Sequence, residues 1–288
     1  MHWNKILIIV VTYNAMQWAE RCLKSIANSK HSCDAFIVDN GSTDGTQDFI
    51  LKNFPEFKFV QSEVNLGFGA ANNIGLKYAV DHNYDFVYLL NQDAWIFPDT
   101  VERLIALHTE HPEFGILSPM QFAADTKHLD TGFKRIYDGA TDTDTPELRT
   151  VTSVMAAHWF LPIEIVKKVG GFSPTFFHYG EDFNYTDRIH YHDYLIGVAK
   201  NARAVHDRFD RPTSREKDLY LKDTSNLIRL SNPEHSFCLN LVMTAFYAVA
   251  FAAKSTSFSP LKGFFKQLRC LKSIRNNRTI SQQPKAFL

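Results

Sequence analysis

The sequence predicts an α/β fold: a Rossmann-like, mostly parallel sheet flanked by helices, followed by a helical C-terminal extension. Over the first two hundred residues, short apolar runs alternate with longer segments of helical periodicity, which is typical of a parallel sheet wrapped by helices. In addition, the run 86–90 is apolar throughout, as expected of a strand that is buried on both faces.

The individual elements follow from apolar runs and from the Gly, Asn, Ser and Pro clusters that separate them. We expect strands at 5–11, 34–39, 57–61, 84–90 and 114–119, with helices at about 15–29, 43–54, 69–81 and 98–111. Further along, a short strand is expected at 202–205. Residues 121–150 are polar and have no clear period, so they predict a loop or an irregular hairpin over the sheet edge.

Composition divides the chain into two parts. The 288 residues are 45% hydrophobic, enough for a large core, and the formal net charge is zero. Residues 236–288, however, hold eight Lys or Arg and no Asp or Glu, which leaves 23 basic against 31 acidic residues upstream. We therefore expect a main domain over 1–235 and a basic extension over 236–288.

Cysteine usage and the N-terminal region both favour the cytoplasm. The four cysteines form no CxxC pair, so neither a zinc site nor a disulfide framework is indicated, and a reducing compartment fits best. The apolar run 6–11 is too short for a signal peptide, so export is not expected.

The extension has the composition of a membrane-surface segment. Residues 237–253 carry no charge but are interrupted by Asn240 and Thr244, so we expect an interfacial rather than a spanning helix. An amphipathic basic helix is expected next, with Lys262, Lys266, Arg269, Lys272 and Arg275 alternating with Phe265, Leu268, Leu271 and Ile274. Together they favour peripheral contact through 237–278 with the inner face of the cell membrane. A helix packed on the body, with a solvated basic face, is an equally favoured alternative.

Polar clusters follow three of the predicted strands. Because the carboxyl ends of parallel strands meet at one edge, these clusters should face one ligand crevice. A carboxylate at Asp39 can accept hydrogen bonds from a nucleobase imide or a ribose hydroxyl, and Asp93 can bind a hard metal ion. The structural alternatives are an Asx turn after Asp39 and a helix cap at Asp93. The clusters comprise Thr12, Tyr13 and Asn14, then Asp39, and finally Asn91, Gln92 and Asp93.

A glycine-rich joint, residues 65–73, follows the third strand and opens a helix, so its backbone amides could approach a phosphate or ribose closely. It nearly matches a dinucleotide fingerprint, but Asn72 stands at the third glycine and the joint follows the third strand rather than the first. The match is therefore weak evidence for NAD.

Two adjacent carboxylates, Glu181 and Asp182, stand at the expected start of a helix that runs to about His192. Acids at this position can simply complement the helix dipole. They can also supply a general base, because burial among the preceding aromatic residues would raise a carboxylate pKa towards working pH. We favour Asp182 as that base. His206 is a candidate metal or phosphate ligand, although a lone histidine is more often structural. The acidic body and the lack of any known motif argue against nucleic-acid binding.

Jointly, the motifs resemble those of family 2 glycosyltransferases, and most closely the rhamnosyltransferase-like branch. The resemblance covers about residues 4–210 and rests on VVTYN, VDNGSTDGT, NLGFGAANNIG, LLNQDA, GGF with FFHYGED, and AVH, in that order. It implies a GT-A fold, a nucleotide-diphosphate sugar donor, Mg²⁺ or Mn²⁺ as the divalent cation, and inversion at the anomeric carbon.

Carried over by position, the resemblance assigns roles to individual residues. The metal motif is Asn91-Gln92-Asp93, in which Asn91 replaces an acidic residue, so Asp93 would be the principal ligand and His206 would complete the site. Asp182 matches the catalytic base and Glu181 its neighbour, while Asn184 stands where the family often has a second acid. The donor would be held by Thr12, Tyr13, Asn14, Asp39, Asn65, Gly67, Asn72, Gln92 and Asp93.

The leading hypothesis is an inverting, metal-dependent transferase that moves a sugar from a dTDP- or UDP-sugar, with dTDP-rhamnose as a candidate, to a saccharide hydroxyl. The acceptor would be lipid-linked, and the pathway would be bacterial surface polysaccharide synthesis. One alternative is a catalytically silent module that binds nucleotide or sugar, which Asn91 and Asn184 favour. Another is an NAD-dependent oxidoreductase, although no YxxxK segment is present.

Overall fold

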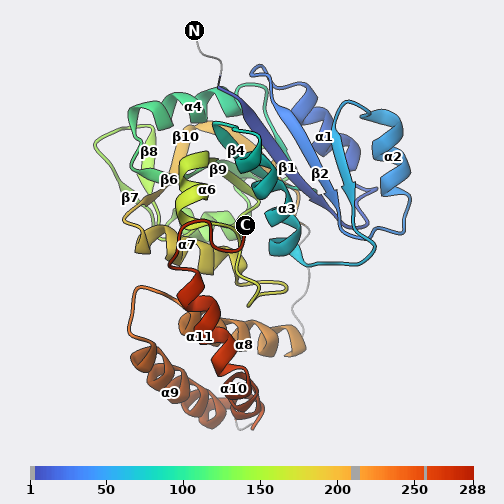
Figure 1. The fold of residues 1–288 in the computed structure, drawn as a ribbon. Coiled ribbons are helices and arrows are strands. Elements are labelled where there is room, and N and C mark those ends of the chain that lie inside the picture. Colours follow the sequence, from blue (N-terminus) through green and yellow to red (C-terminus); the bar gives the residue numbers. More distant parts are fainter. Residues whose placement is uncertain (1–3, 209–214, 256–257) are drawn as a thin grey trace.

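The computed structural model describes residues 4–208, 215–255 and 258–288 and confirms a mixed α/β fold (Figure 1). The strands are β1 (Ile6–Thr12), β2 (Asp34–Asp39), β3 (Lys58–Gln61), β4 (Phe86–Asn91), β5 (Ala94–Ile96), β6 (Phe114–Phe122), β7 (Thr141–Asp142), β8 (Leu148–Thr150), β9 (His158–Pro162) and β10 (Leu195–His206). The helices are α1 (Ala19–Ala27), α2 (Thr46–Asn53), α3 (Phe68–Asp81), α4 (Thr100–Glu110), α5 (Thr131–Tyr137), α6 (Ile163–Val169), α7 (Glu181–Tyr191), α8 (Arg215–Ser231), α9 (Phe237–Ser255), α10 (Ser259–Arg269) and α11 (Leu271–Ile280).

The strands form one sheet in the order β3-β2-β1-β4-β9-β6-β10-β8-β7, and β5 pairs with β10. The five strands expected in the first 120 residues are present, and β1, β2, β3 and β4 pair in parallel as predicted. The sheet is mixed, however, because β9 enters antiparallel between β4 and β6. The short strand expected at 202–205 is the end of the much longer β10.

Alternating side chains of β1 enter two separate hydrophobic cores, one on each face of the sheet. Ile6 and Ile8 pack with residues of α1, α2 and α4 on one face of the sheet, and Leu7 and Ile9 pack with residues of α3, α6 and α7 on the other. This alternation is the period of two that a strand imposes, and here both faces are apolar because helices cover both. The sheet edge that carries the polar clusters is thereby held rigid from both sides.

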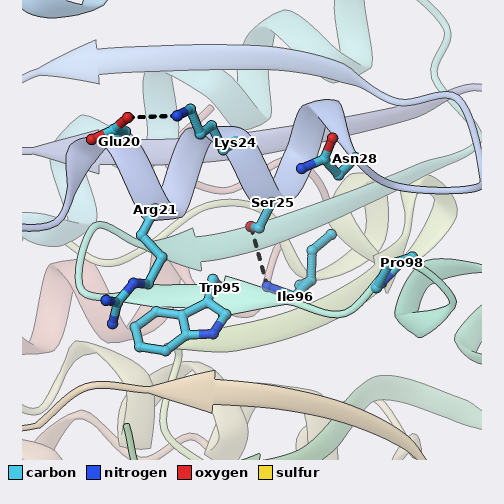
Figure 2. Close-up of a pocket in the computed structure, with 8 residues that line it drawn as sticks. All are labelled: Glu20, Arg21, Lys24, Ser25, Asn28, Trp95, Ile96 and Pro98. Atoms are coloured by element: carbon cyan, nitrogen blue, oxygen red, sulfur yellow. Dashed lines mark hydrogen bonds and ion pairs between the residues drawn. The ribbon is translucent and has the colours of Figure 1, made fainter.

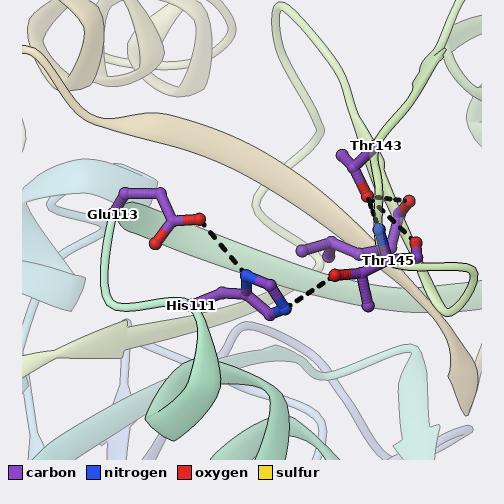
Figure 3. Close-up of polar contacts among 5 residues, drawn as sticks. His111, Glu113, Thr143 and Thr145 are labelled. Atoms are coloured by element: carbon purple, nitrogen blue, oxygen red, sulfur yellow. Dashed lines mark hydrogen bonds and ion pairs between the residues drawn. The ribbon is translucent and has the colours of Figure 1, made fainter.

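The region 121–150 contains the expected hairpin, β7 with β8, at the sheet edge beyond β10. It also contains α5, which was not predicted. The Asp130 carboxylate caps that helix by accepting a hydrogen bond from Phe133 N at 2.7 Å, and the Phe133 ring is fully buried. The hairpin is tied to the end of α4, since His111 contacts Thr145 Oγ1 at 2.9 Å and Glu113 at 3.3 Å (Figure 3).

Helices α8 to α11 form a separate layer that lies beyond the sheet domain in Figure 1. α8, upstream of residue 236, packs against α9, α10 and α11. The single basic helix expected from the sequence is wrong in one respect, because the chain breaks at Cys270 into α10 and α11. The periodicity of basic and apolar residues cannot by itself reveal such a break, since the same spacing continues on both sides of it.

After α11 the chain returns to the sheet domain. Gly171 N donates to Ala286 O at 2.7 Å, and Lys285 N donates to Lys167 O at 2.8 Å. The fully buried Arg188 of α7 donates to the carbonyls of Val169, Gly171 and Ser281, and burial lowers its pKa to about 10. The segment after α11 therefore fastens the helical layer to the joint between α6 and α7.

Candidate active site

The polar clusters do meet at one edge of the sheet. In the strand registers, Thr12 lies opposite Asp39, and Val11 lies opposite Asn91. The carboxyl ends of β1, β2 and β4 are thus level with one another, as the sequence predicted. Asp93 lies in the two-residue joint between β4 and β5, whereas the residue before α4 is Asp99, so Asp93 does not cap that helix.

Asp39 is the anchor of the first two loops. It is fully buried and accepts hydrogen bonds from Thr12 Oγ1, from the amide and hydroxyl of Ser42, and from Gln47 Nε2. These four donors use most of what a carboxylate can accept. A direct contact from Asp39 to a nucleobase would require one of them to move, so in this state Asp39 holds the ends of β1 and β2 and the start of α2 together.

The loop after β1 is clamped on two sides. Asn14 has a φ of 50°. Its side-chain Oδ1 accepts a hydrogen bond from Thr43 N at 2.9 Å, and its backbone N–H donates to Ser42 Oγ at 2.9 Å. On the other side, Gln92 forms two hydrogen bonds with the Tyr13 backbone. Its Oε1 accepts from Tyr13 N at 2.7 Å, and its Nε2 donates to Tyr13 O at 3.2 Å. The Tyr13 side chain is 45% exposed, so it is the group of this loop that can stack on a base.

The glycine-rich joint is tied to the same network through Asn40, which the sequence reading had not singled out. Asn65 Oδ1 accepts from Asn40 Nδ2 at 3.0 Å and from Gly67 N at 2.9 Å. Gly67 has φ 85°, and a side chain there would clash with the carbonyl of Phe177. Asn72 is buried and donates to Phe68 O, so it forms part of the α3 wall behind the joint.

Antiparallel pairing of β5 with β10 explains how His206 reaches Asp93. His206 lies opposite Ala94, Asp207 N donates to Asp93 O at 2.7 Å, and His206 Nε2 is 3.5 Å from Asp93 Oδ1. Burial raises the pKa of Asp93, but the hydrogen bond and charge of His206 and the charge of Arg208 outweigh it and hold that pKa below its usual value. Asp93 is therefore ionised at neutral pH and able to bind a cation.

The donor set fits a cation that shares its ligands with a substrate. Asn91 Oδ1 and His206 Nδ1 are buried without a hydrogen-bond partner among the described residues. No group of three or more His, Cys, Asp or Glu side chains in the described part of the chain could hold a metal by itself. Two protein ligands plus an amide oxygen suit Mg²⁺ or Mn²⁺, because such ions keep waters and substrate phosphates in their coordination shell.

The two carboxylates of α7 begin that helix directly after a strained turn. Tyr179 and Gly180 both have positive φ, and a side chain at Gly180 would clash with Thr224 of α8. Burial, followed by the charge of Asp182, raises the pKa of Glu181 to about 7, and its Oε2 has no partner among the described residues. Burial also raises the pKa of the half-buried Asp182 above the ordinary aspartate range.

Arg208, which the sequence did not mark as a site residue, acts electrostatically on both Asp93 and Asp182. Its charge lowers the pKa of Asp93 and partly offsets the rise at Asp182, so the guanidinium lies within electrostatic reach of both groups. Gly132 of α5 leaves the space that the Arg208 guanidinium occupies, here called its seat, because a side chain at Gly132 would clash with Arg208 Nη1. No short motif marks this pair, since it depends on how α5 packs beside the end of β10.

A family model described as glycosyl transferase family 2 matches residues 7–164, more than half of the chain. The chain belongs to glycosyl transferase family 2. The matched residues include Asp39 and Asp93 and end within α6, before Asp182 and His206. The family predicted from the sequence is therefore confirmed, while the roles assigned to individual residues stay predictions.

A curated relative of this family 2 chain is the N-acetylglucosaminyl-diphospho-decaprenol L-rhamnosyltransferase of Mycobacterium tuberculosis. The two are 28% identical over 122 residues, which cover 39% of this chain and 40% of that protein. The matched segment thus spans less than half of the relative.

Solved structures confirm the GT-A fold. Residues 1–349 of S. aureus TarS in complex with UDP-GlcNAc match at TM-score 0.60 and 16% identity, over 96% of this chain and 90% of that one. GalNAc-T7 with UDP, GalNAc and Mn²⁺ matches at TM-score 0.58 and 14% identity, over 81% of this chain and 51% of that one.

A hollow of about 410 Å³ lies between α1 and β5 (Figure 2). Arg21 stacks over the Trp95 ring at 4.6 Å, and Glu20 pairs with Lys24 on the same helix. None of the residues lining this hollow is a predicted site residue, so we do not include it in the active site.

Substitution of Gly132 should impair the site without harming the fold. In Gly132→Ala the new methyl group must displace the Arg208 guanidinium, while helix propensity improves. We expect an unchanged or higher Tm and a loss of roughly 10- to 100-fold in kcat/KM, the usual cost of a charge-assisted contact. Gly139→Ala is the matched control, because its nearest neighbour atom would be 3.6 Å away. If Gly132→Ala and Arg208→Ala were additive in a double-mutant cycle, the proposed seat would be wrong.

Glu181 should make stability depend on pH. Because the folded state raises its pKa from 4.5 to about 7, the fold favours the protonated side chain. That contribution is complete below the unfolded pKa and is lost as pH rises through the folded one. Glu181→Gln should therefore stabilise the protein by up to about 3 kcal/mol at about pH 8 and change little at about pH 5. Urea unfolding at both pH values tests this, with the exposed Glu164→Gln as control; an equal effect at both would contradict it.

Proposed function

We propose that this chain is an inverting glycosyltransferase that transfers a sugar from a dTDP- or UDP-sugar to a hydroxyl of a saccharide acceptor. The observation that carries the proposal is the contrast between two carboxylates, Asp93 and Asp182, on both of which the charge of Arg208 acts. Asp93, with a lowered pKa, is suited to a cation, whereas Asp182, with a raised pKa, is suited to a proton. Two acids whose environments push their pKa values apart are the usual mark of divided catalytic roles.

In this mechanism Asp182 accepts the proton of the acceptor hydroxyl as its oxygen attacks the anomeric carbon. The bond from that carbon to the donor diphosphate breaks on the opposite face, so configuration inverts in a single displacement and no covalent enzyme intermediate forms. Arg208, seated on Gly132, stabilises the negative charge that grows on the departing diphosphate. Tyr13 stacks on the base, and the backbone amides of the joint around Gly67 approach the ribose and phosphates.

Asp93 and His206, with Asn91, would hold Mg²⁺ or Mn²⁺, which supplies Lewis-acid neutralisation of the leaving diphosphate. Support comes from the fit of the donor set described above and from the Mn²⁺ bound in the GalNAc-T7 structure. Because Asn91 stands where an acid would bind the cation, Arg208 would share with the cation the neutralisation of the leaving diphosphate.

The acceptor we propose is lipid-linked, and the product is a bacterial surface polysaccharide. The name of the Mycobacterium tuberculosis relative describes a sugar on a diphospho-decaprenol lipid, and that relative supports this class of acceptor. We accordingly propose that the chain works at the cytoplasmic face of the cell membrane. The catalytic domain would be residues 1–235 and the extension 236–288.

Nucleotide-dependent thermal stabilisation tests this function first. A ligand at 100 times its Kd should add about 2.7 kcal/mol, or roughly 5–10 °C in Tm for a chain of this size. We expect that full rise with UDP or dTDP only when Mg²⁺ or Mn²⁺ is present, a smaller rise with either nucleotide alone, and none with GDP or NAD. A rise with NAD alone would favour an oxidoreductase.

Donor turnover separates an enzyme from a silent module. We expect consumption of the matching nucleotide sugar in the presence of a saccharide acceptor, with an inverted anomeric configuration in the product by NMR. Binding without any turnover would instead support the silent module, which Asn184 favours because it stands where the family often has a second acid.

A further inference from the structure

Helix α9 carries an unusual apolar stripe on its exposed side. Leu239, Val242, Phe246 and Val249 recur at steps of three or four residues, and each is more than half exposed. We call these four residues the outer face of α9. The stretch Phe237–Lys254 has a mean hydropathy of 1.6, yet only 17% of it is buried. In water such a face carries a large penalty, because roughly 25 cal/mol is lost for each Å² of apolar surface left exposed.

The buried side of α9 is less apolar than its exposed side, because two polar residues are buried there together with Ala248. Asn240 and Thr244 are buried against the rest of the helical layer. Both are satisfied within that layer: Asn240 Nδ2 donates to Asn232 O, and Thr244 Oγ1 donates to Asn240 O. The helix therefore departs from the normal pattern, because two polar residues lie inside while the four large apolar residues of the outer face lie outside. Such an arrangement suits contact with an apolar phase on the outer side.

The surroundings of the outer face are basic. Phe258 and Phe265 are exposed nearby at the start and on the surface of α10, which packs against α9 (Figure 1). Exposed cations border these two residues along the sequence, namely Lys254, Lys262, Lys266, Arg269 and Lys272. Residues 236–288 contain no acidic residue.

We propose that the outer face of α9, together with Phe258, Phe265 and the bordering cations, binds the interface of an anionic lipid bilayer. The charge decides between occupants. A second copy of this chain docked face to face would oppose two sets of cations, whereas anionic headgroups complement them. The helix lies along the interface rather than across it, because its inner side is packed on the helical layer through Asn240 and Thr244. The inference draws on the proposed function only in that a lipid-linked acceptor would lie at the same surface.

Flotation of the full chain with lipid vesicles tests the proposal. We expect binding to vesicles of phosphatidylcholine with phosphatidylglycerol, and at least tenfold weaker binding to phosphatidylcholine alone or in high salt. Leu239→Glu should weaken binding to the anionic vesicles at least tenfold, and Val242→Glu with Phe246→Glu should abolish it. Leu51→Glu is the matched control, because Leu51 on α2 and Leu239 are both 53% exposed.

Several outcomes would overturn the proposal. These are the absence of vesicle binding, equal binding to neutral and anionic vesicles, or equal losses in Leu239→Glu and Leu51→Glu. A dimer in light scattering that Leu239→Glu converts to a monomer, without vesicle binding, would assign the face to a second copy instead. Donor turnover with a soluble saccharide acceptor needs no vesicle and is expected to be the same in Leu239→Glu and the parent. Its absence in the parent would count against the proposed function, and not against the membrane surface.

Discussion

Asp182→Asn should lower kcat by about 10²- to 10⁴-fold, the range expected when a general base is removed. The donor KM should change little, because the proton leaves the acceptor only in the transition state. The substitution is nearly isosteric, and the raised pKa of Asp182 means that the fold already tolerates a neutral side chain at this position. Steady-state kinetics with both substrates varied, together with a nucleotide-dependent Tm, would separate lost chemistry from lost binding.

Asp187→Asn provides a control on the same helix. Asp187 is also half-buried on α7, and burial, followed by the charge of Glu234, raises its pKa to about 7. It differs from Asp182 in that Arg208 is not among the groups that shift its pKa. We expect near-parental turnover for this variant. Unaltered turnover in Asp182→Asn, or equal losses in both variants, would remove Asp182 from the role of base.

The parent enzyme should also lose activity in acid. Because burial raises the pKa of Asp182 and of its neighbour Glu181, kcat/KM should fall as pH drops through an apparent pKa above the ordinary carboxylate range.

Asp93→Asn should reduce kcat/KM by about 10²- to 10³-fold, which corresponds to the several kcal/mol of charge stabilisation that a bound cation supplies. The variant keeps an oxygen ligand but loses the charge that His206 and Arg208 now stabilise. Its diagnostic readout does not need turnover: the increment in Tm that Mn²⁺ adds to dTDP or UDP should vanish, while the increment from nucleotide alone stays.

Asp99→Asn is the control for this second experiment. Asp99 lies six residues further along, before α4, where it pairs with Arg103 at 2.7 Å on the surface. A surface ion pair of this kind contributes little, so both Tm increments should be retained. If Asp93→Asn kept its metal-dependent increment, the cation would have to bind elsewhere.

The sequence predicted the parts of the site that lie next to strand ends, because apolar strands and polar joints leave a local signal. Thr12, Asp39 and Asn91 are level at one edge for that reason. The sequence could not predict which hydrogen bonds these groups form. Gln92 was expected at the donor, yet both ends of its amide hold the Tyr13 backbone in this structure.

Long-range pairing was equally invisible in the sequence. The antiparallel entry of β9, and the pairing of β5 with β10, join segments separated by more than sixty residues. Periodicity describes one segment at a time, so it placed His206 at a strand end without bringing it to Asp93. For the same reason, periodicity could not reveal the close approach of Arg208 to Gly132. It also presented Asn240 and Thr244 as interruptions of an apolar run rather than as residues on the buried side of α9.

The return of the chain to the α6–α7 joint changes how residues 236–288 should be regarded. They are not a free tail, because Ser281 and Ala286 receive hydrogen bonds from Arg188 and Gly171 of the sheet domain. Gly170, at φ 88°, has no room for a side chain against Ala286. The helical layer thus follows the end of β10 at His206, and the segment after it is hydrogen-bonded back to the joint between α6 and α7. Deleting it would unfasten α7, so point substitutions on its surface, rather than truncation, can separate anchoring from catalysis.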